Sequence, residues 1–143
     1  MFNQVTASLG SYTLTALLRH PEFNITVISR ESSSANFPST QKVIKVLDSY
    51  PRDALVDAFR GQDVVILNIV MEAQDPSKQL IDAAIKAGVK RIVPSDYGST
   101  VTSGKTTSVF PLAAKANVIL DYLAEKKGSG LTWTAVKSGI FFD

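Results

Sequence analysis

The sequence predicts an α/β domain built on a doubly wound parallel sheet. Strand-like and helix-like segments alternate along the whole chain, and the connections between the strands leave room only for crossover helices. The chain has 143 residues, of which 45% are hydrophobic and 20% charged, as in a globular protein of one domain. Because no repeat, linker or low-complexity segment divides it, we expect residues 1–143 to form a single domain.

Apolar periodicity marks the elements of the first half. Leu14, Leu17 and Leu18 recur at helical spacing before Pro21, which disfavours helical geometry in the residue that precedes it. The β-branched runs FNITVIS and QKVIKVL are typical of strands. These patterns predict a helix over residues 9–19 and strands over residues 23–29 and 41–47.

The second half repeats the order of strand and helix. Pro51 suits the first turn of a helix and Gly61 suits its C-terminal cap. The continuous apolar run DVVILNIV is typical of a strand that is buried on both faces. We expect Phe59 and Trp133 in the core. The predicted elements are strands over 63–70, 90–94 and 131–136, and helices from Pro51 to Gly61, from Asp75 to Gly88, and from Leu112 to near Gly128.

Composition excludes several classes of protein. Fifteen Lys and Arg residues and thirteen Asp and Glu residues give a net charge of +2 that is spread along the chain, so we expect no nucleic-acid partner. The absence of Cys excludes disulfides and thiolate metal sites, and it indicates a reducing, cytoplasmic compartment. Apolar stretches such as residues 64–67 are far shorter than the ~20 residues of a membrane span. We therefore expect a cytoplasmic protein that binds small molecules, without a metal or a membrane.

Ligands of such a sheet bind at the carboxyl ends of its strands, so the informative residues follow a strand or open the next helix. Arg30 follows the strand over 23–29, where a dinucleotide-binding protein keeps an acid for a ribose hydroxyl or a cation for a 2′-phosphate. An arginine there favours NADP over NAD, and a solvated loop charge is the equally weighted alternative. The candidates for cofactor binding are Ser8, Leu9, Gly10, Arg30, Asp48, Asn68, Ser95, Gly139 and Phe141.

Small-residue turns follow the last two strands. They are PSDYG over 94–98 and SGIFF over 138–142, and small residues let a backbone approach a flat ring closely. Together with the segments FNITVISR, GQDVV, IDAAIKAGVKR and LTWT, they resemble the isoflavone reductase-like, or NmrA-like, family of atypical short-chain dehydrogenases, from about residue 6 onward. The resemblance implies an NADPH-binding, Rossmann-like fold. Enzymes of that family reduce small aromatic or phenylpropanoid-like substrates by hydride transfer.

The resemblance also implies a catalytic lysine. In the family it opens the helix after the penultimate strand and is preceded by a phenylalanine, and here Phe110 and Lys115 match. The spacing from Lys115 to Tyr122 is slightly longer than the family's. A lysine ammonium there can hydrogen-bond a carbonyl or phenolic oxygen and stabilise the charge that develops as hydride arrives. The alternative is an exposed helix lysine.

Tyr122 and Lys126 form a rival pair, because they have the Tyr-x-x-x-Lys spacing of ordinary short-chain dehydrogenases. Helices of this fold begin at the ligand edge and run away from it. At 1.5 Å per residue, Lys126 lies roughly 16 Å further along the helix than Lys115. We therefore expect the spacing to be a coincidence.

The two ends of the chain depart from the family's pattern. The dinucleotide fingerprint needs a strand, a glycine-rich turn and a helix, but residues 4–10 (QVTASLG) keep only Gly10. Gln4 and Ala7 replace the glycines that let the backbone reach the pyrophosphate. We therefore expect a first strand that is missing or very short. The two strands that would flank it then expose the edges that face each other. We also expect weak cofactor binding. The chain ends soon after the last strand, so we also expect it to lack the substrate region.

Three interpretations of function follow. The first is an NADPH-dependent reductase, which Lys115 favours. The second is a regulatory protein of the NmrA type, which senses the dinucleotide and binds a partner protein without chemistry. The third is a truncated product without independent activity, which the first ten residues and the abrupt end favour. We expect the family member to be a reductase and the isolated chain to be inactive.

Overall fold

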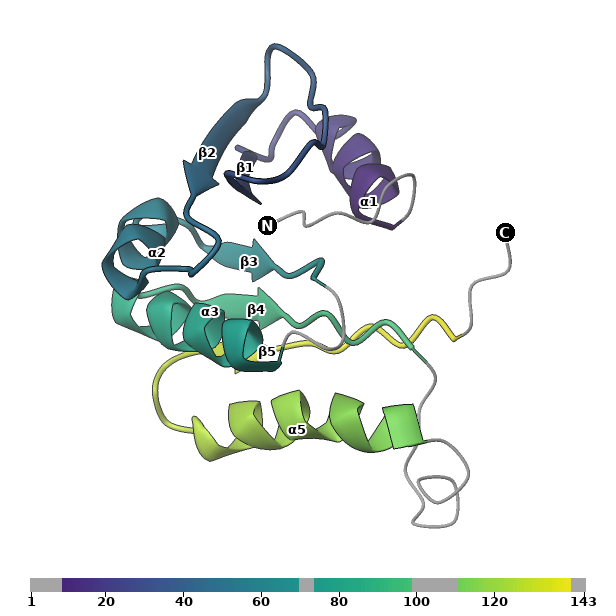
Figure 1. Cartoon of the computed structure of the whole chain (residues 1–143), viewed down its shortest axis with the longest axis vertical. Helices are drawn as coiled ribbons and strands as arrows, with labels where there is room; N and C mark the ends of the chain where they lie inside the picture. Colours follow the sequence, from purple (N-terminus) through teal and green to yellow (C-terminus); the bar gives the residue numbers. More distant parts are fainter. Residues whose placement is uncertain (1–8, 70–73, 99–110, 140–143) are drawn as a thin grey trace.

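The computed structural model describes residues 9–69, 74–98 and 111–139, with the backbone alone for 111–117. Helices and parallel strands follow one another along the described chain, as Figure 1 shows, which confirms the predicted α/β class. The predicted alternation is wrong at one place, because residues 31–41 join the parallel strands β1 and β2 without a helix. The elements are α1 (Leu9–Leu18), β1 (Thr26–Arg30), β2 (Lys42–Val46), α2 (Arg52–Phe59), β3 (Val64–Ile66), α3 (Gln74–Ala87), β4 (Arg91–Val93), α5 (Pro111–Glu125) and β5 (Thr132–Trp133).

The described strands form two parallel sheets. In the first, β1 pairs with β2 in parallel, with Thr26 opposite Lys42. In the second, β4 lies between β3 and β5, with Val65 opposite Ile92 and Ile92 opposite Trp133. Within the described residues no ladder joins β1 to β3. The described strands follow the doubly wound order, β2-β1 and then β3-β4-β5, with a place for a central strand between β1 and β3. The prediction for that central strand falls on residues 1–8, outside the described residues.

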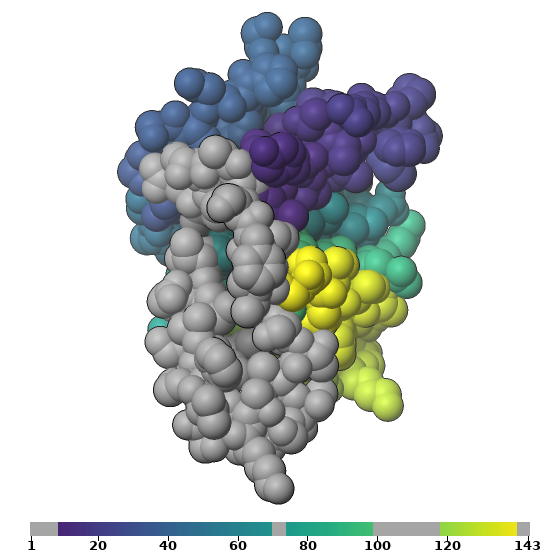
Figure 2. Space-filling view, turned by 90° about the vertical axis from the view of Figure 1, so that its right-hand side faces the viewer, coloured from purple at the N-terminus to yellow at the C-terminus, as the bar shows by residue number. Residues whose placement is uncertain are grey.

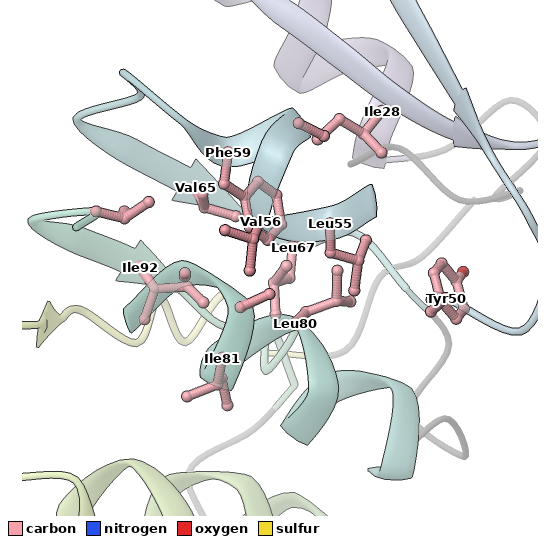
Figure 3. Close-up of a cluster of buried hydrophobic side chains, with 14 of the residues drawn as sticks. Ile28, Tyr50, Leu55, Val56, Phe59, Val65, Leu67, Leu80, Ile81 and Ile92 are labelled. Carbon is pink, nitrogen blue, oxygen red and sulfur yellow. The ribbon is translucent and has the colours of Figure 1, made fainter. Parts of the chain in front are cut away.

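The main core lies between the strands and the helices α2, α3 and α5. Phe59 is 1% exposed, which confirms its predicted place in the core. Each large apolar side chain that is buried in this way stabilises the fold by ~1.5 to 3 kcal/mol. A second, smaller cluster packs Leu14 of α1 against Val27 of β1. Figure 3 shows the main cluster, including Ile28, Tyr50, Leu55, Val56, Phe59, Val65, Leu67, Leu80, Ile81 and Ile92.

Two predictions about burial are wrong. Trp133 is 41% exposed, because β5 is an edge strand with a described neighbour on one flank only. Val64 is 48% exposed, so β3 is not buried on both faces along its whole length. Side chains alternate along a strand, and Val65 points into the core with the helices while Val64 points away from it. The strand is also shorter than predicted and ends at Ile66.

Glycines end two of the helices as predicted. Gly61 and Gly88 have φ values of 75° and 78°, in the left-handed region that favours glycine at a helix C-terminus. The N–H of Gln62 donates to the carbonyl of Phe59 across the first of these turns, at 3.0 Å. Helix α3 begins at Gln74, one residue before the predicted start at Asp75, and Asp75 lies in its first turn.

Candidate functional site

The candidate site lies at the carboxyl edge of the sheet β3-β4-β5. Figure 1 shows β3 and β4 pointing toward the side of the molecule on which α5 begins. Figure 2 views the molecule from this side, with residues of α1 in purple and residues that follow β5 in yellow. Polar side chains follow β4 and β5 at this edge, and several of them are buried or half-buried.

Ser95 and Tyr97 connect β4 with the segment after β3. The Ser95 Oγ accepts the Ile69 N–H at 3.1 Å and donates to the Ile69 carbonyl at 2.6 Å. The Tyr97 hydroxyl donates to the Leu67 carbonyl at 2.9 Å. Burial raises the pKa of Tyr97 to about 12, so this phenol stays neutral and keeps its proton for the bond. These side chains extend the pairing of β3 and β4 beyond the last residues of both strands.

Asp96 and Tyr97 make the corresponding connection toward β5. Asp96 is 3% exposed, and its Oδ2 forms an ion pair with the Nζ of Lys137. Both the N–H and the hydroxyl of Ser138 donate to the Tyr97 carbonyl, at 3.1 and 2.6 Å. We call Ser95, Asp96 and Tyr97 the polar clamp, because these consecutive residues bind both neighbouring strand ends. The sequence pattern of residues 94–98 predicted a turn of small residues and a cofactor-binding Ser95, but it did not predict these contacts between strand ends.

Asn68 follows β3 and is 3% exposed. Neither its Oδ1 nor its Nδ2 has a hydrogen-bond partner among the described residues, and the same holds for Asp96 Oδ1. Buried polar groups are almost always hydrogen-bonded in proteins, so an unpartnered pair of amide atoms needs an explanation. An amide that can both donate and accept a hydrogen bond at a ligand edge fits a polar group of a bound molecule.

The structure brings Arg30 and Asp48 together at the carboxyl ends of β1 and β2. The Arg30 Nη1 lies 3.9 Å from Asp48 Oδ2. The backbone N–H of Ser32 donates to Asp48 Oδ1 at 3.2 Å, and its hydroxyl donates to Asp48 Oδ2. These two bonds from Ser32, with the charge of Arg30, hold the pKa of Asp48 below its ordinary value. Ser32 was not among the predicted site residues, although a hydroxyl side chain two residues after Arg30 could have indicated it.

The other predicted cofactor residues lie at separate places. Leu9 and Gly10 open α1, and Gly10 is buried. Gly139 has a φ of 85° and follows the Ser138 turn. The predictions for Ser8 and Phe141 fall outside the described residues.

Lys115 lies in the first turns of α5, which begins at Pro111. The structure therefore places its backbone at the carboxyl edge of the sheet, as Figure 1 shows for the start of this helix. The side chain of Lys115 and the whole of Phe110 lie outside the described residues. The direction of α5 agrees with the prediction that its first turns, rather than its last turn, lie at the ligand edge.

Tyr122 and Lys126 instead bind α5 to α3. The Tyr122 hydroxyl donates to Asp82 Oδ1 at 2.8 Å, and the Lys126 Nζ lies 3.1 Å from the same oxygen. The Lys126 ammonium also lies 4.4 Å from the centroid of the Tyr122 ring. The hydroxyl of Tyr122 and the carboxylate of Asp82 raise the pKa of Lys126. These contacts between two helices account for the Tyr-x-x-x-Lys spacing without chemistry.

No helix in the described ranges is long and apolar enough to cross a membrane.

A doubly wound sheet with polar groups gathered at its carboxyl edge defines an α/β domain of the nucleotide-binding class. Residues 6–143 match the family described as NAD(P)H-binding. The chain therefore belongs to this NAD(P)H-binding family.

Curated relatives carry oxidoreductase names. The chain is 39% identical over 137 residues to "Oxidoreductase aprR" of Aspergillus flavus, covering 95% of this chain and 46% of that protein. It is 38% identical over 85 residues to "Oxidoreductase poxI" of Penicillium oxalicum, covering 59% and 26%. An "NmrA-like family domain-containing oxidoreductase lnaB" of Aspergillus flavus is 26% identical over 152 residues, covering 96% and 45%. The expected resemblance to NmrA-like proteins is confirmed, and the chain spans at most about half the length of these relatives.

A solved structure has the same fold. "MoeE5 in complex with UDP-glucuronic acid and NAD" aligns with a TM-score of 0.50 at 23% identity, covering 90% of this chain and 50% of that one. The likeness confirms the Rossmann-like fold.

Proposed function

We propose that the chain is the dinucleotide-binding part of an NADPH-dependent reductase. The reductase transfers hydride to a small aromatic or phenylpropanoid-like substrate. The observation that supports this proposal most is Arg30 at the carboxyl end of β1, where a cation selects for the 2′-phosphate of NADPH. Membership of the NAD(P)H-binding family and the oxidoreductase names of the relatives support the broader part of the proposal.

The described residues fit such a cofactor in three ways. The amino end of α1, with the buried Gly10, is a helix N-terminus of the kind that binds a pyrophosphate. Arg30 supplies positive charge for the adenosine end. The amide of Asn68, which has no hydrogen-bond partner in the part of the chain that the structure describes, supplies a buried donor and acceptor at the edge of the sheet. When bound, NADPH supplies the hydride.

In this proposal Lys115 holds the carbonyl or phenolic oxygen of the substrate. Its place in the first turns of α5, at the edge where the strands end, supports this role. The ammonium stabilises the negative charge that develops on that oxygen. The proposal also includes a cytoplasmic location and a small-molecule partner, without nucleic acid or membrane, which the dispersed charge and the absence of Cys support.

Cofactor preference tests the proposal directly. We expect the chain to bind NADPH more tightly than NADH in a fluorescence titration. Arg30→Asp should lower the affinity for NADPH by about tenfold or more, since one charge-assisted contact to a phosphate is worth roughly 1.5 to 3 kcal/mol. It should not weaken NADH binding, because an acid at this position can bind a ribose hydroxyl. The matched control is Arg60→Asp, because Arg60 is an exposed arginine that is paired with Asp57 at the end of α2. Equal affinities of the wild type for the two dinucleotides would contradict the preference.

An activity assay separates the reductase from the regulatory alternative. NADPH oxidation in the presence of aromatic carbonyl compounds, measured with the protein at the full length of its relatives, supports the reductase. Tight NADPH binding without turnover, together with capture of a partner protein that depends on the cofactor, supports dinucleotide sensing of the NmrA type instead.

A further inference from the structure

Three hydrogen-bond donors or cationic groups gather around one carboxylate at the ends of β1 and β2. They are the Ser32 N–H at 3.2 Å, the Ser32 hydroxyl, and the Arg30 guanidinium at 3.9 Å from Asp48. We call Ser32 and Arg30 the anion cradle. Asp48 is the anion that this cradle holds in the structure.

The loop that carries the cradle is tightly held. The Glu31 N–H donates to the Val46 carbonyl at 2.8 Å, which continues the β1–β2 pairing, and the Ser33 N–H donates to the Arg30 carbonyl at 3.1 Å. The Lys45 ammonium donates to the carbonyls of Arg30 and Ser33, both at 3.1 Å. These bonds fix the backbone on both sides of Ser32, so the donors of the cradle are arranged before a ligand arrives.

A phosphate and a carboxylate can bind to the same donors of the anion cradle. Each is an anion that accepts hydrogen bonds from a backbone N–H, a hydroxyl and a guanidinium. Both hydrogen-bond donors of Ser32 are bonded to Asp48 in the structure. A phosphate that takes these donors must therefore displace Asp48, and the two negative charges repel each other while both are close.

We propose that Asp48 competes with the 2′-phosphate of the dinucleotide for the anion cradle and so lowers the affinity for NADPH. This inference rests on the proposed function, because it takes Arg30 as the cation that meets the 2′-phosphate. It assigns Ser32 as a further residue that binds the phosphate. It also gives Asp48 a role opposite to that of an ordinary cofactor ligand.

The test uses two nucleotides that differ in the phosphate concerned. 2′,5′-ADP carries the 2′-phosphate and 5′-ADP does not, and amide shifts in nuclear magnetic resonance follow the binding of either one at millimolar concentration. Asp48→Asn should tighten 2′,5′-ADP binding about three- to tenfold by removing a like charge close to the phosphate, while 5′-ADP binding changes by less than about twofold. Ser32→Ala should weaken the binding of 2′,5′-ADP and leave the binding of 5′-ADP unchanged.

A matched control and a second variant complete the experiment. Asp63→Asn removes another exposed carboxylate that is paired with a cation, Lys90, outside the cradle, and it should change neither affinity. Asp48→Ala removes both hydrogen-bond acceptors and should tighten 2′,5′-ADP binding at least as much as Asp48→Asn.

The possible failures differ from one another. Weaker or unchanged binding of 2′,5′-ADP to both Asp48 variants would overturn the competition and leave the proposed function standing. If neither nucleotide binds the wild type or any variant, the proposed function fails and the competition fails with it.

Discussion

Lys137→Met is expected to lower the free energy of unfolding by about 3 kcal/mol, because removal of one partner of a buried ion pair leaves the other charge uncompensated. The carboxylate left behind belongs to Asp96, whose side chain is 4% exposed, and Lys137 itself is 24% exposed. Asp96 Oδ1 has no other partner among the described residues that could replace the ammonium. Urea unfolding should show the loss as a lower midpoint with an unchanged slope.

Two further variants check the origin of this loss. Asp96→Asn combined with Lys137→Met removes both charges, so the double variant should recover a large part of the stability. Lys90→Met breaks an ion pair with Asp63 that is exposed on both sides, and it should leave the midpoint nearly unchanged. If Lys137→Met and Lys90→Met lost similar amounts of stability, burial of the Asp96 carboxylate would not be the cause of the loss in Lys137→Met.

Lys115→Ala is expected to lower the catalytic rate by roughly 10² to 10⁴, because the variant loses the ammonium that stabilises the charge developing on the substrate oxygen. The affinity for NADPH should stay nearly unchanged, since the proposed contact of Lys115 is with the substrate. The assay measures kcat and the Kd of NADPH separately. It uses the protein at the full length of its relatives, of which the 143 residues span at most about half.

Lys126→Ala and Tyr122→Phe are the controls on the same helix. Both side chains bind Asp82 of α3, so the variants should leave kcat almost unaffected. Loss of activity in these variants, with Lys115→Ala active, would contradict the assignment of the catalytic residue. It would then be necessary to place the ligand edge at the other end of α5.

Much of the fold could be predicted because its signals are local. The leucine stripe before Pro21 predicted α1 to within a residue at its end, and Gly61 and Gly88 marked the ends of α2 and α3. Strand lengths were harder to predict. The run DVVILNIV is apolar throughout, yet β3 ends at Ile66, and Val64 points away from the core.

The site could be predicted only in part. Arg30 and Asp48 were found because each follows a strand, and the structure brings them together with Ser32. Lys137 could not be found, because nothing in its neighbouring residues distinguishes it from a solvated lysine. Its importance comes from the buried carboxylate of Asp96, to which it is paired.

The sequence by itself determined the α/β class, the parallel pairing of the strands and the edge at which the candidate residues gather. Periodicity, proline and glycine act over a few neighbouring residues, so their effects can be read without a structure. Only the tertiary structure decided which side chains meet. Asp96 and Lys137 are 41 residues apart in the chain, and Ser32 and Asp48 are 16 apart. They come into contact because parallel neighbouring strands end side by side, and that pairing depends on the packing of the whole core.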